Sequence, residues 1–279
     1  DIGNPLTESF TTAEYADLDA TLSGTTLPTI KSYFGEFWDG IPYAGVVGDT
    51  LGLDADGRVG VIVTKEVNKD GSALGFVNPL DLTATSLCPG SNQAEGFYGI
   101  APDPDGLYAL GAITKAEVAA LMPKLITHEV THILQSTQYF YNPVTASKAA
   151  WESEGGATLA EQLVGNAVYG VGSGQNLGST EWLLDYNTTD KWYYSWAGDL
   201  RQYFGLNSIN APEECTWLAN DNGGPCWDGR AVYGVTATLL RFILDQYGPS
   251  YAGGEAALIR DLTSSAQTGY DNLETATGQ

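Results

Sequence analysis

Positively charged residues are scarce in this sequence: 12 Lys and Arg stand against 34 Asp and Glu, which gives a formal net charge of −22. Phosphate groups are bound mainly by clustered Lys and Arg, so nucleic acid and anionic membrane surfaces are poor partners. Long apolar runs are also missing, and a membrane-spanning helix needs roughly 20 consecutive apolar residues. We therefore expect no nucleic-acid partner and no membrane span. The acidity fits an extracellular protein, calcium binding or a saline habitat, and composition does not separate these.

Cysteine is rare as well, with three residues in a chain of 279. Cys215 and Cys226 bracket a loop rich in Gly, Asn and Asp, which predicts a disulfide between them, with two unpaired thiols as the alternative. Cys88 is left over, either buried or paired with a group outside this chain. The chain opens at Asp1 with neither an initiator Met nor a basic-then-apolar leader. We therefore expect a processed product or a chain without its signal peptide.

Hydrophobic patterning places strands early in the chain and helices later. The β-branched run 59–67 predicts a buried strand, and the run 97–101 predicts a second one. Helices are expected at 27–37, 150–168 and 229–247. Because the strands precede the helices rather than alternating with them, the pattern indicates an α+β fold. We expect an N-terminal β-rich lobe, 1–113, and a helical lobe, 114–279, that carries the functional site.

The helical half of the sequence begins with a recognisable helix-capping pattern. Thr114 followed three residues later by Glu117 is a capping-box pattern. The helical pattern that follows is interrupted by Pro123, and proline is unfavourable inside a helix but suited to its first turn. The sequence therefore predicts a short helix, a break near Met122, and a longer helix over 123–139.

The sequence holds only two histidines, and both belong to one motif, His128-Glu129-Val130-Thr131-His132. A spacing of four residues places both imidazoles on one face of a helix, close enough to share a metal ion. Glu129 can lean over the open coordination position and take a proton from a water there. The alternative is two ordinary polar residues on a solvated helix. Apolar neighbours argue against it: Leu125, Ile126, Val130, Ile133 and Leu134.

Two histidines do not complete a catalytic zinc site, which usually has three protein ligands and one water. No third histidine exists, so the remaining ligand must be a carboxylate or, failing that, a cysteine. The nearest downstream carboxylates lie in the segment 151–161. A helix that starts there and packs antiparallel to the first would present a carboxylate from its first turns. The small residues Gly155, Gly156 and Ala157 would let the two backbones approach closely.

The motif resembles that of the gluzincin group of zinc peptidases, in which His-Glu-x-x-His is followed by a ligand Glu, often within Glu-Gly-x-Ala. Glu154-Gly155-Gly156-Ala157 matches that pattern. The resemblance therefore implies zinc bound by His128, His132 and Glu154, with Glu152 as the alternative third ligand. It also implies a zincin-like fold, in which a mixed β-sheet lobe precedes a mainly helical lobe and the active-site helix lies between them.

A narrower resemblance is to secreted bacterial neutral metalloproteases of the hyicolysin type. The stretches that carry it are 33–35, 54–59, 88–95 and 98–104, together with the histidine motif. This resemblance implies secretion into the extracellular space and hydrolysis of protein or peptide substrates, with endopeptidase activity favoured.

Further roles follow from how such an enzyme works. Glu129 is expected to be the general base, and Tyr233 is expected to donate a hydrogen bond to the developing oxyanion, since no third histidine is present. Tyr233 resembles the helical Tyr with this role in other gluzincins; the alternative is a core aromatic. Thr158 or Glu161 could accept a hydrogen bond from a ligand imidazole. By analogy, the strand 97–101 is expected to be the sheet edge along which a peptide substrate pairs.

Two acidic segments resemble fragments of calcium loops, with Asp54 and Asp56 in one and Asp103 and Asp105 in the other. Neither completes the EF-hand pattern, and ordinary acidic turns are the alternative. Two other functions also fit the sequence: a zincin-fold surface module that binds without cleaving, and a zinc hydrolase acting on a non-peptide bond.

Overall fold

The computed structural model describes residues 9–37, 54, 56–142, 144–172, 191–204 and 231–278 of the chain. Across these residues the fold is mixed α+β, as the sequence predicts. The helices are α1 (Thr12–Thr21), α2 (Leu27–Phe34), α3 (Lys65–Asp70), α4 (Lys115–Tyr141), α5 (Ala150–Tyr169), α7 (Tyr194–Tyr203), α8 (Ala231–Tyr247), α9 (Gly254–Ser264) and α10 (Gly269–Thr277). A π-helical turn, η1 (Leu22–Thr26), joins α1 to α2, and two short 3₁₀ turns are η2 (Pro79–Leu82) and η4 (Gly248–Ser250).

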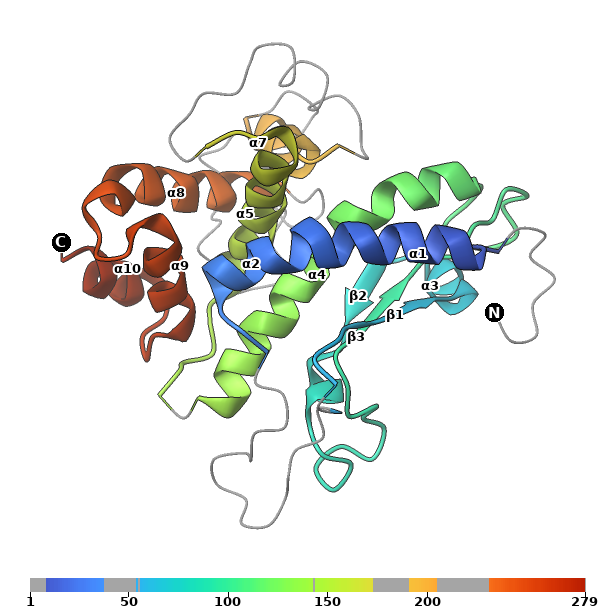
Figure 1. Ribbon diagram of the computed structural model, residues 1–279, viewed down its shortest axis with the longest axis horizontal. Helices are drawn as coiled ribbons and strands as arrows, with labels where there is room; N and C mark the ends of the chain where they lie inside the picture. Colours follow the sequence, from blue (N-terminus) through green and yellow to red (C-terminus); the bar gives the residue numbers. More distant parts are fainter. Residues whose placement is uncertain are drawn as a thin grey trace.

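Helix α4 is the central element of the fold. It crosses the centre of the described structure, with the small sheet on one side and α8, α9 and α10 on the other (Figure 1). It packs against α2, α5 and α9 as well as against two of the strands. The site that α4 carries is therefore bordered by elements from both halves of the sequence.

The sheet in the described residues has three strands: β1 (Gly60–Val63), β2 (Gly75–Val77) and β3 (Gly96–Gly99). Their order is β1-β3-β2, with β1 parallel and β2 antiparallel to β3. The predicted strand 97–101 corresponds to β3, but β3 is the central strand and has no free edge. The expectation that a substrate pairs along it is wrong, and the edge strands of the described sheet are β1 and β2.

The prediction of a buried strand over 59–67 is also only partly right. The strand ends at Val63, and Thr64 caps α3 by accepting a hydrogen bond from the backbone N–H of Glu66. Exposed and half-buried residues alternate along β1, and the Ile62 side chain is 44% exposed. A β-branched run of this kind favours a strand but does not establish that both of its faces are covered.

The predicted break near Met122 is wrong, because α4 continues through Pro123. Proline inside a helix costs roughly 3 kcal/mol, since it removes one backbone hydrogen bond and crowds the preceding turn. The apolar face of α4 offsets this cost by packing into the core. Val118, Met122 and Ile126, which flank the proline on either side, are 1% exposed or less. The capping box at the start of α4 is present as predicted.

The other helix predictions agree with the structure within a few residues. The predicted helices 150–168 and 27–37 correspond to α5 and α2, and α2 stops at Phe34 because Gly35 adopts a positive φ of 97°. The predicted helix at 229–247 corresponds to α8, whose described part begins at Ala231. The proposed division at 113/114 falls at the N-cap of α4. The described part of the first half contains α1, α2 and α3 as well as the strands.

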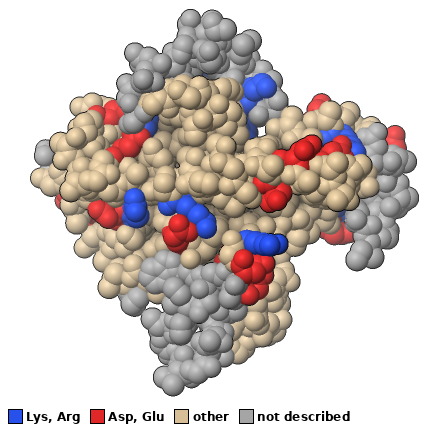
Figure 2. All heavy atoms as spheres, viewed as in Figure 1, with Lys and Arg blue, Asp and Glu red and all other residues tan. Residues whose placement is uncertain are grey.

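On the face that Figure 2 presents, Lys and Arg side chains lie beside Asp and Glu side chains. Lys115 is 2.7 Å from Glu14, and Arg241 is 2.6 Å from Glu255. Among the helices of the described residues, none has both the length and the apolar character that a membrane crossing requires.

The buried carboxylate of Glu152 ties the C-terminal helix to the start of α5. One of its oxygens accepts hydrogen bonds from the backbone N–H groups of Ala149 and Gly269 and from the Thr268 hydroxyl, at 2.9, 2.7 and 2.7 Å. The other oxygen accepts from the Asn272 amide at 2.9 Å. Glu152 is only 9% exposed and its carboxylate bonds to the start of α10, so it is not the alternative metal ligand that the sequence allowed.

We predict that Glu152→Ala lowers the free energy of unfolding by roughly 3 kcal/mol, because several buried donors lose a charged acceptor. Urea denaturation measures this change. The matched control is Glu274→Ala on the exposed side of α10, which should stay within about 0.5 kcal/mol of the original protein. Equal stability of the two variants would contradict the role given to Glu152.

Candidate metal centre

Helix α4 presents both histidines of the motif from one face. The ring centroids of His128 and His132 lie 5.0 Å apart. His128 is 9% exposed, and the flanking Ile126, Val130 and Ile133 are each 3% exposed or less. The expectation that the motif lies on a largely buried helix, rather than on a solvated one, is therefore confirmed.

Two glycines let α5 approach its neighbours closely enough to place a carboxylate beside the histidines. A Cβ on Gly156 would lie 2.7 Å from the Nε2 atom of Gln135 on α4. A Cβ on Gly155 would lie 2.8 Å from the Oγ1 atom of Thr236 on α8. Real Cβ contacts are longer than this, so neither position tolerates a side chain without rearrangement. Glu154, which immediately precedes them, is brought to the histidine face of α4.

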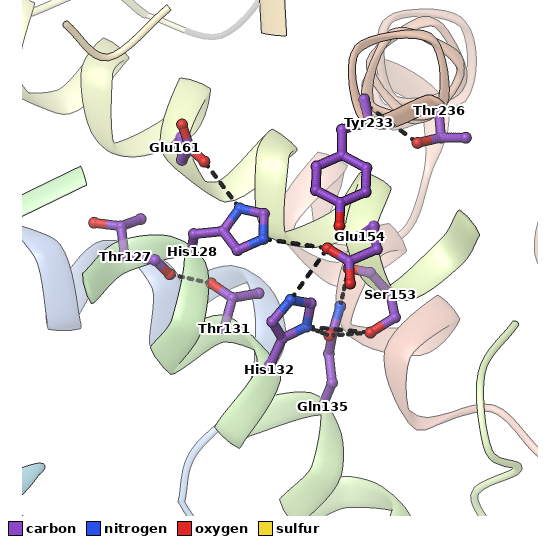
Figure 3. A network of polar contacts seen from close by, with 10 residues as sticks. All are labelled: Thr127, His128, Thr131, His132, Gln135, Ser153, Glu154, Glu161, Tyr233 and Thr236. Atoms are coloured by element: carbon purple, nitrogen blue, oxygen red, sulfur yellow. Dashed lines mark hydrogen bonds and ion pairs between the residues drawn. The ribbon is translucent and has the colours of Figure 1, made fainter. Parts of the chain in front are cut away.

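Three side chains converge on one point, as Figure 3 shows. The Oε2 atom of Glu154 is 3.2 Å from the Nε2 atom of His128 and 3.4 Å from that of His132. One ligand atom from each residue lies within 4.8 Å of the others. Ligand atoms about 2 Å from a tetrahedral ion are roughly 3.4 Å from one another, so the spacing is compatible with a metal ion.

The electrostatics of this cluster favour positive charge. Burial opposes protonation of the two imidazoles, but hydrogen bonds to Glu154 outweigh it and raise the pKa of both. Glu161 adds to the effect on His128, whose pKa rises to about 10. Burial likewise opposes ionisation of Glu154, but the histidines lower its pKa below its usual range. A metal cation would compete with protons for the same nitrogen atoms.

The outer acceptor for His128 is Glu161, one of the two residues that the sequence allowed. Its Oε1 atom is 2.9 Å from the Nδ1 atom of His128, and its side chain is almost fully buried. The Thr158 hydroxyl is buried and has no hydrogen-bond partner within the described part of the chain. The contact to Glu161 fixes the imidazole so that its Nε2 atom faces Glu154.

Sequence reasoning missed the partners of His132. The Nδ1 atom of His132 lies 3.0 Å from the Oε1 atom of Gln135 and 3.2 Å from the Ser153 hydroxyl. Gln135 is three residues along the same helix, so the helical period could have found it. The position of Ser153 depends on how α5 packs against α4, which no spacing in the sequence reveals.

Glu129 and Tyr233 border the same cavity as the three converging residues, and this cavity has a volume of about 790 Å³. Burial raises the pKa of Glu129, while the nearby histidines and a hydrogen bond from the Val77 backbone oppose the rise. The Tyr233 ring stacks on His128, with the centroids 6.0 Å apart. In Figure 3 its hydroxyl points toward Glu154. The structure thus brings together all five residues named from the sequence.

The walls of the cavity come from both sides of α4. The edge strand β2 and the residues just before it form one wall, and α5, α7 and α8 form the other. Besides the five residues already named, the lining includes Ser72, Leu74, Gly75, Val77, Leu125, Tyr194 and Asp199. The converging ligands therefore lie inside a cleft between the sheet edge and the helices, and not on an open surface.

The possible calcium segments have the contacts of ordinary acidic turns. Asp103 is fully buried, and its carboxylate accepts hydrogen bonds from the backbone N–H groups of Leu107 and Tyr108. Asp54 and Asp56 are exposed and each accept a hydrogen bond from a backbone N–H two residues on. These contacts match the alternative that the sequence allowed.

Cys88 is a free, half-buried thiol. The predicted pair Cys215 and Cys226 lies outside the described residues. The pairing between them therefore stays a prediction.

No protein-family model matches this chain, and no curated protein matches it either. The assignment of a metal site therefore depends on the geometry of His128, His132 and Glu154. Within the described ranges, these three residues form the one group of His, Cys, Asp or Glu side chains gathered closely enough to hold an ion.

We predict that Glu154→Gln weakens metal binding by more than about a hundredfold, because an anionic ligand is replaced by a neutral one. Glu152→Gln, only two residues away, should bind the metal as the original protein does, because Glu152 faces α10. Titration of metal-free protein with zinc against a competing chelator measures both constants. Loss of binding in the Glu152 variant with binding kept in the Glu154 variant would contradict the ligand set.

Proposed function

We propose that this chain is a secreted zinc-dependent metallopeptidase with a zincin-like fold, similar to the gluzincin group. The observation that carries the proposal is the position of Glu129: its carboxylate lines the same cavity as the three converging ligand residues. A structural metal site is usually closed by four protein ligands, whereas a catalytic zinc has three and leaves one position open. Two histidines and one carboxylate, with the Glu129 carboxyl group beside them, correspond to a catalytic zinc site with one open position.

The donor set favours zinc. Imidazole nitrogen suits zinc, copper, iron and nickel, whereas calcium and magnesium prefer oxygen ligands in larger number. When bound, zinc supplies a Lewis acid that polarises the scissile carbonyl and lowers the pKa of a water molecule. His128, His132 and Glu154 would hold it.

Glu129 is suited to the role of general base. Burial keeps the pKa of its carboxyl above the usual value, so it can accept a proton from water and then pass it to the leaving amine. The hydrogen bond from the Val77 backbone restrains the carboxylate at the edge of the sheet. Tyr233, across the cavity, is suited to donate its hydroxyl hydrogen to the oxyanion that forms on the substrate carbonyl.

The substrate would be an extended protein or peptide segment. Strand β2 is an edge strand, and its residues Gly75 and Val77 line the cavity. A peptide can pair with such an edge through its backbone, which leaves alternate side chains free to enter pockets. We therefore assign to β2 the role that the sequence gave to the strand 97–101.

Secretion is supported by the strongly acidic composition and by the resemblance to secreted enzymes. A surface module that binds without cleaving would have no need of a carboxylate beside the metal ligands, so the position of Glu129 favours an enzyme. A zinc hydrolase of non-peptide bonds would share the same centre. Substrate assays separate it from a peptidase.

Glu129→Gln should abolish hydrolysis of casein while zinc stays bound at one ion per chain, because the amide keeps the shape but cannot accept a proton. Elemental analysis and a caseinolysis assay measure the two quantities on the same sample. Glu274→Gln, on the exposed side of α10, is the control and should keep full activity. An active Glu129 variant would rule out the proposed base, and inactive original protein with bound zinc would favour the two alternative functions.

Tyr233→Phe should lower kcat by roughly a hundredfold to a thousandfold with little change in KM, because a donor to the oxyanion acts mainly in the transition state. Steady-state kinetics on one defined peptide gives both constants. Tyr139→Phe removes a hydroxyl from an exposed position on α4 and should leave both unchanged. A change in KM alone would assign Tyr233 to substrate binding instead.

A further inference from the structure

We infer that Gln135, supported by Ser153, is a positioning residue that holds the His132 imidazole in its ligand orientation. The inference rests on the proposed metal centre. It adds the group that contacts the Nδ1 atom of His132, on the opposite side of the ring from the ligand nitrogen. His128 is backed by the carboxylate of Glu161, whereas His132 is backed by a neutral amide and a hydroxyl (Figure 3).

The orientation of the Gln135 amide is settled by its partners. Its Nε2 atom donates to the backbone carbonyl of Ser153 at 3.1 Å. A carbonyl only accepts hydrogen bonds, so the NH₂ group must lie on that side and the Oε1 atom must face His132. The distance from Oε1 to the Nδ1 atom of His132 is 3.0 Å. Since Oε1 can only accept, His132 carries its hydrogen on Nδ1, which leaves Nε2 free to bind a metal ion.

The Ser153 hydroxyl strengthens this arrangement. Its oxygen lies 3.0 Å from the Oε1 atom of Gln135 and 3.2 Å from the Nδ1 atom of His132. The hydroxyl can donate its one hydrogen to Gln135 and still accept a share of the hydrogen on His132. Because Ser153 directly precedes Glu154, one short segment of α5 provides both a ligand and a support for another ligand.

Gly156 makes room for the Gln135 amide, since a Cβ at that position would lie 2.7 Å from Nε2. A similar arrangement occurs one helical turn further on. Gln138 is buried on the same helix, donates to the carbonyl of Glu36 at 3.4 Å, and lies 3.1 Å from the position of a Cβ on Gly35. In the described part of the chain, the Gln138 side chain bonds to the Glu36 carbonyl and to no histidine. Gln135 is half-buried and Gln138 is buried, and each donates its amide to a backbone carbonyl, but only Gln135 contacts a histidine in the described residues.

The test compares Gln135→Leu with Gln138→Leu by the zinc dissociation constant, measured in competition with a chelator of known affinity. We expect Gln135→Leu to raise the constant about tenfold to a hundredfold, the usual effect of losing a group behind a ligand imidazole. Gln138→Leu should leave the zinc dissociation constant within about twofold of the original value. Urea denaturation of metal-free protein measures how far each variant is destabilised, and we expect the difference in zinc binding even if the two are destabilised equally. Cobalt substitution should shift the visible absorption spectrum in the first variant only.

Equal zinc constants for the two leucine variants would overturn the inference and leave the proposed function standing. Absence of zinc binding by the original protein would overturn the proposed metal centre itself. Should Gln135→Leu fail to fold, Ser153→Ala removes only one hydroxyl from the same arrangement. We then expect a several-fold rise in the zinc constant, and an unchanged constant would contradict the role given to this pair.

Discussion

The close packing of α5 against α4 and α8 is the constraint on which the candidate site depends. Gly155 and Gly156 lie where a side chain would collide with Thr236 on one neighbour and Gln135 on the other. This approach places the Glu154 carboxylate within 3.4 Å of both ligand nitrogens. A larger residue at Gly155 would collide with both the side chain and the backbone of Thr236, and one at Gly156 would displace the Gln135 amide. A metal centre tolerates little displacement of a ligand.

The packing of α4 against α5 brings two carboxylates next to the two histidines, and these charges decide what the site can bind. Carboxylates removed from water are costly unless they are paired. Here the buried Glu161 and the half-buried Glu154 are both paired with histidines. The pairing raises the pKa of His128 and His132 and favours a cation between them and Glu154. Glu129 lies beside this cluster with its pKa raised mainly by burial. One cleft therefore combines an anionic ligand set with a carboxyl group prepared to accept a proton.

Local pattern was enough to predict the elements that carry the site, because helical spacing fixes which residues share a face. It placed His128, Glu129 and His132 on α4, and the Glu-Gly-Gly-Ala stretch at the start of α5. It failed where tertiary packing overrides local preference: Pro123 does not break α4, because the buried face around it holds the helix together. Strand order and the contact of Ser153 with His132 depend on packing between separate elements, which the spacing of a single sequence does not encode.

The proposed site requires one ion between α4 and α5, and anomalous diffraction at the zinc absorption edge would locate that ion. We expect one strong anomalous peak in crystals of the intact protein. The peak should lie about 2.0–2.2 Å from the Nε2 atoms of His128 and His132 and from a carboxylate oxygen of Glu154. A peak beside other residues, or no peak in crystals soaked with zinc, would rule out this metal centre.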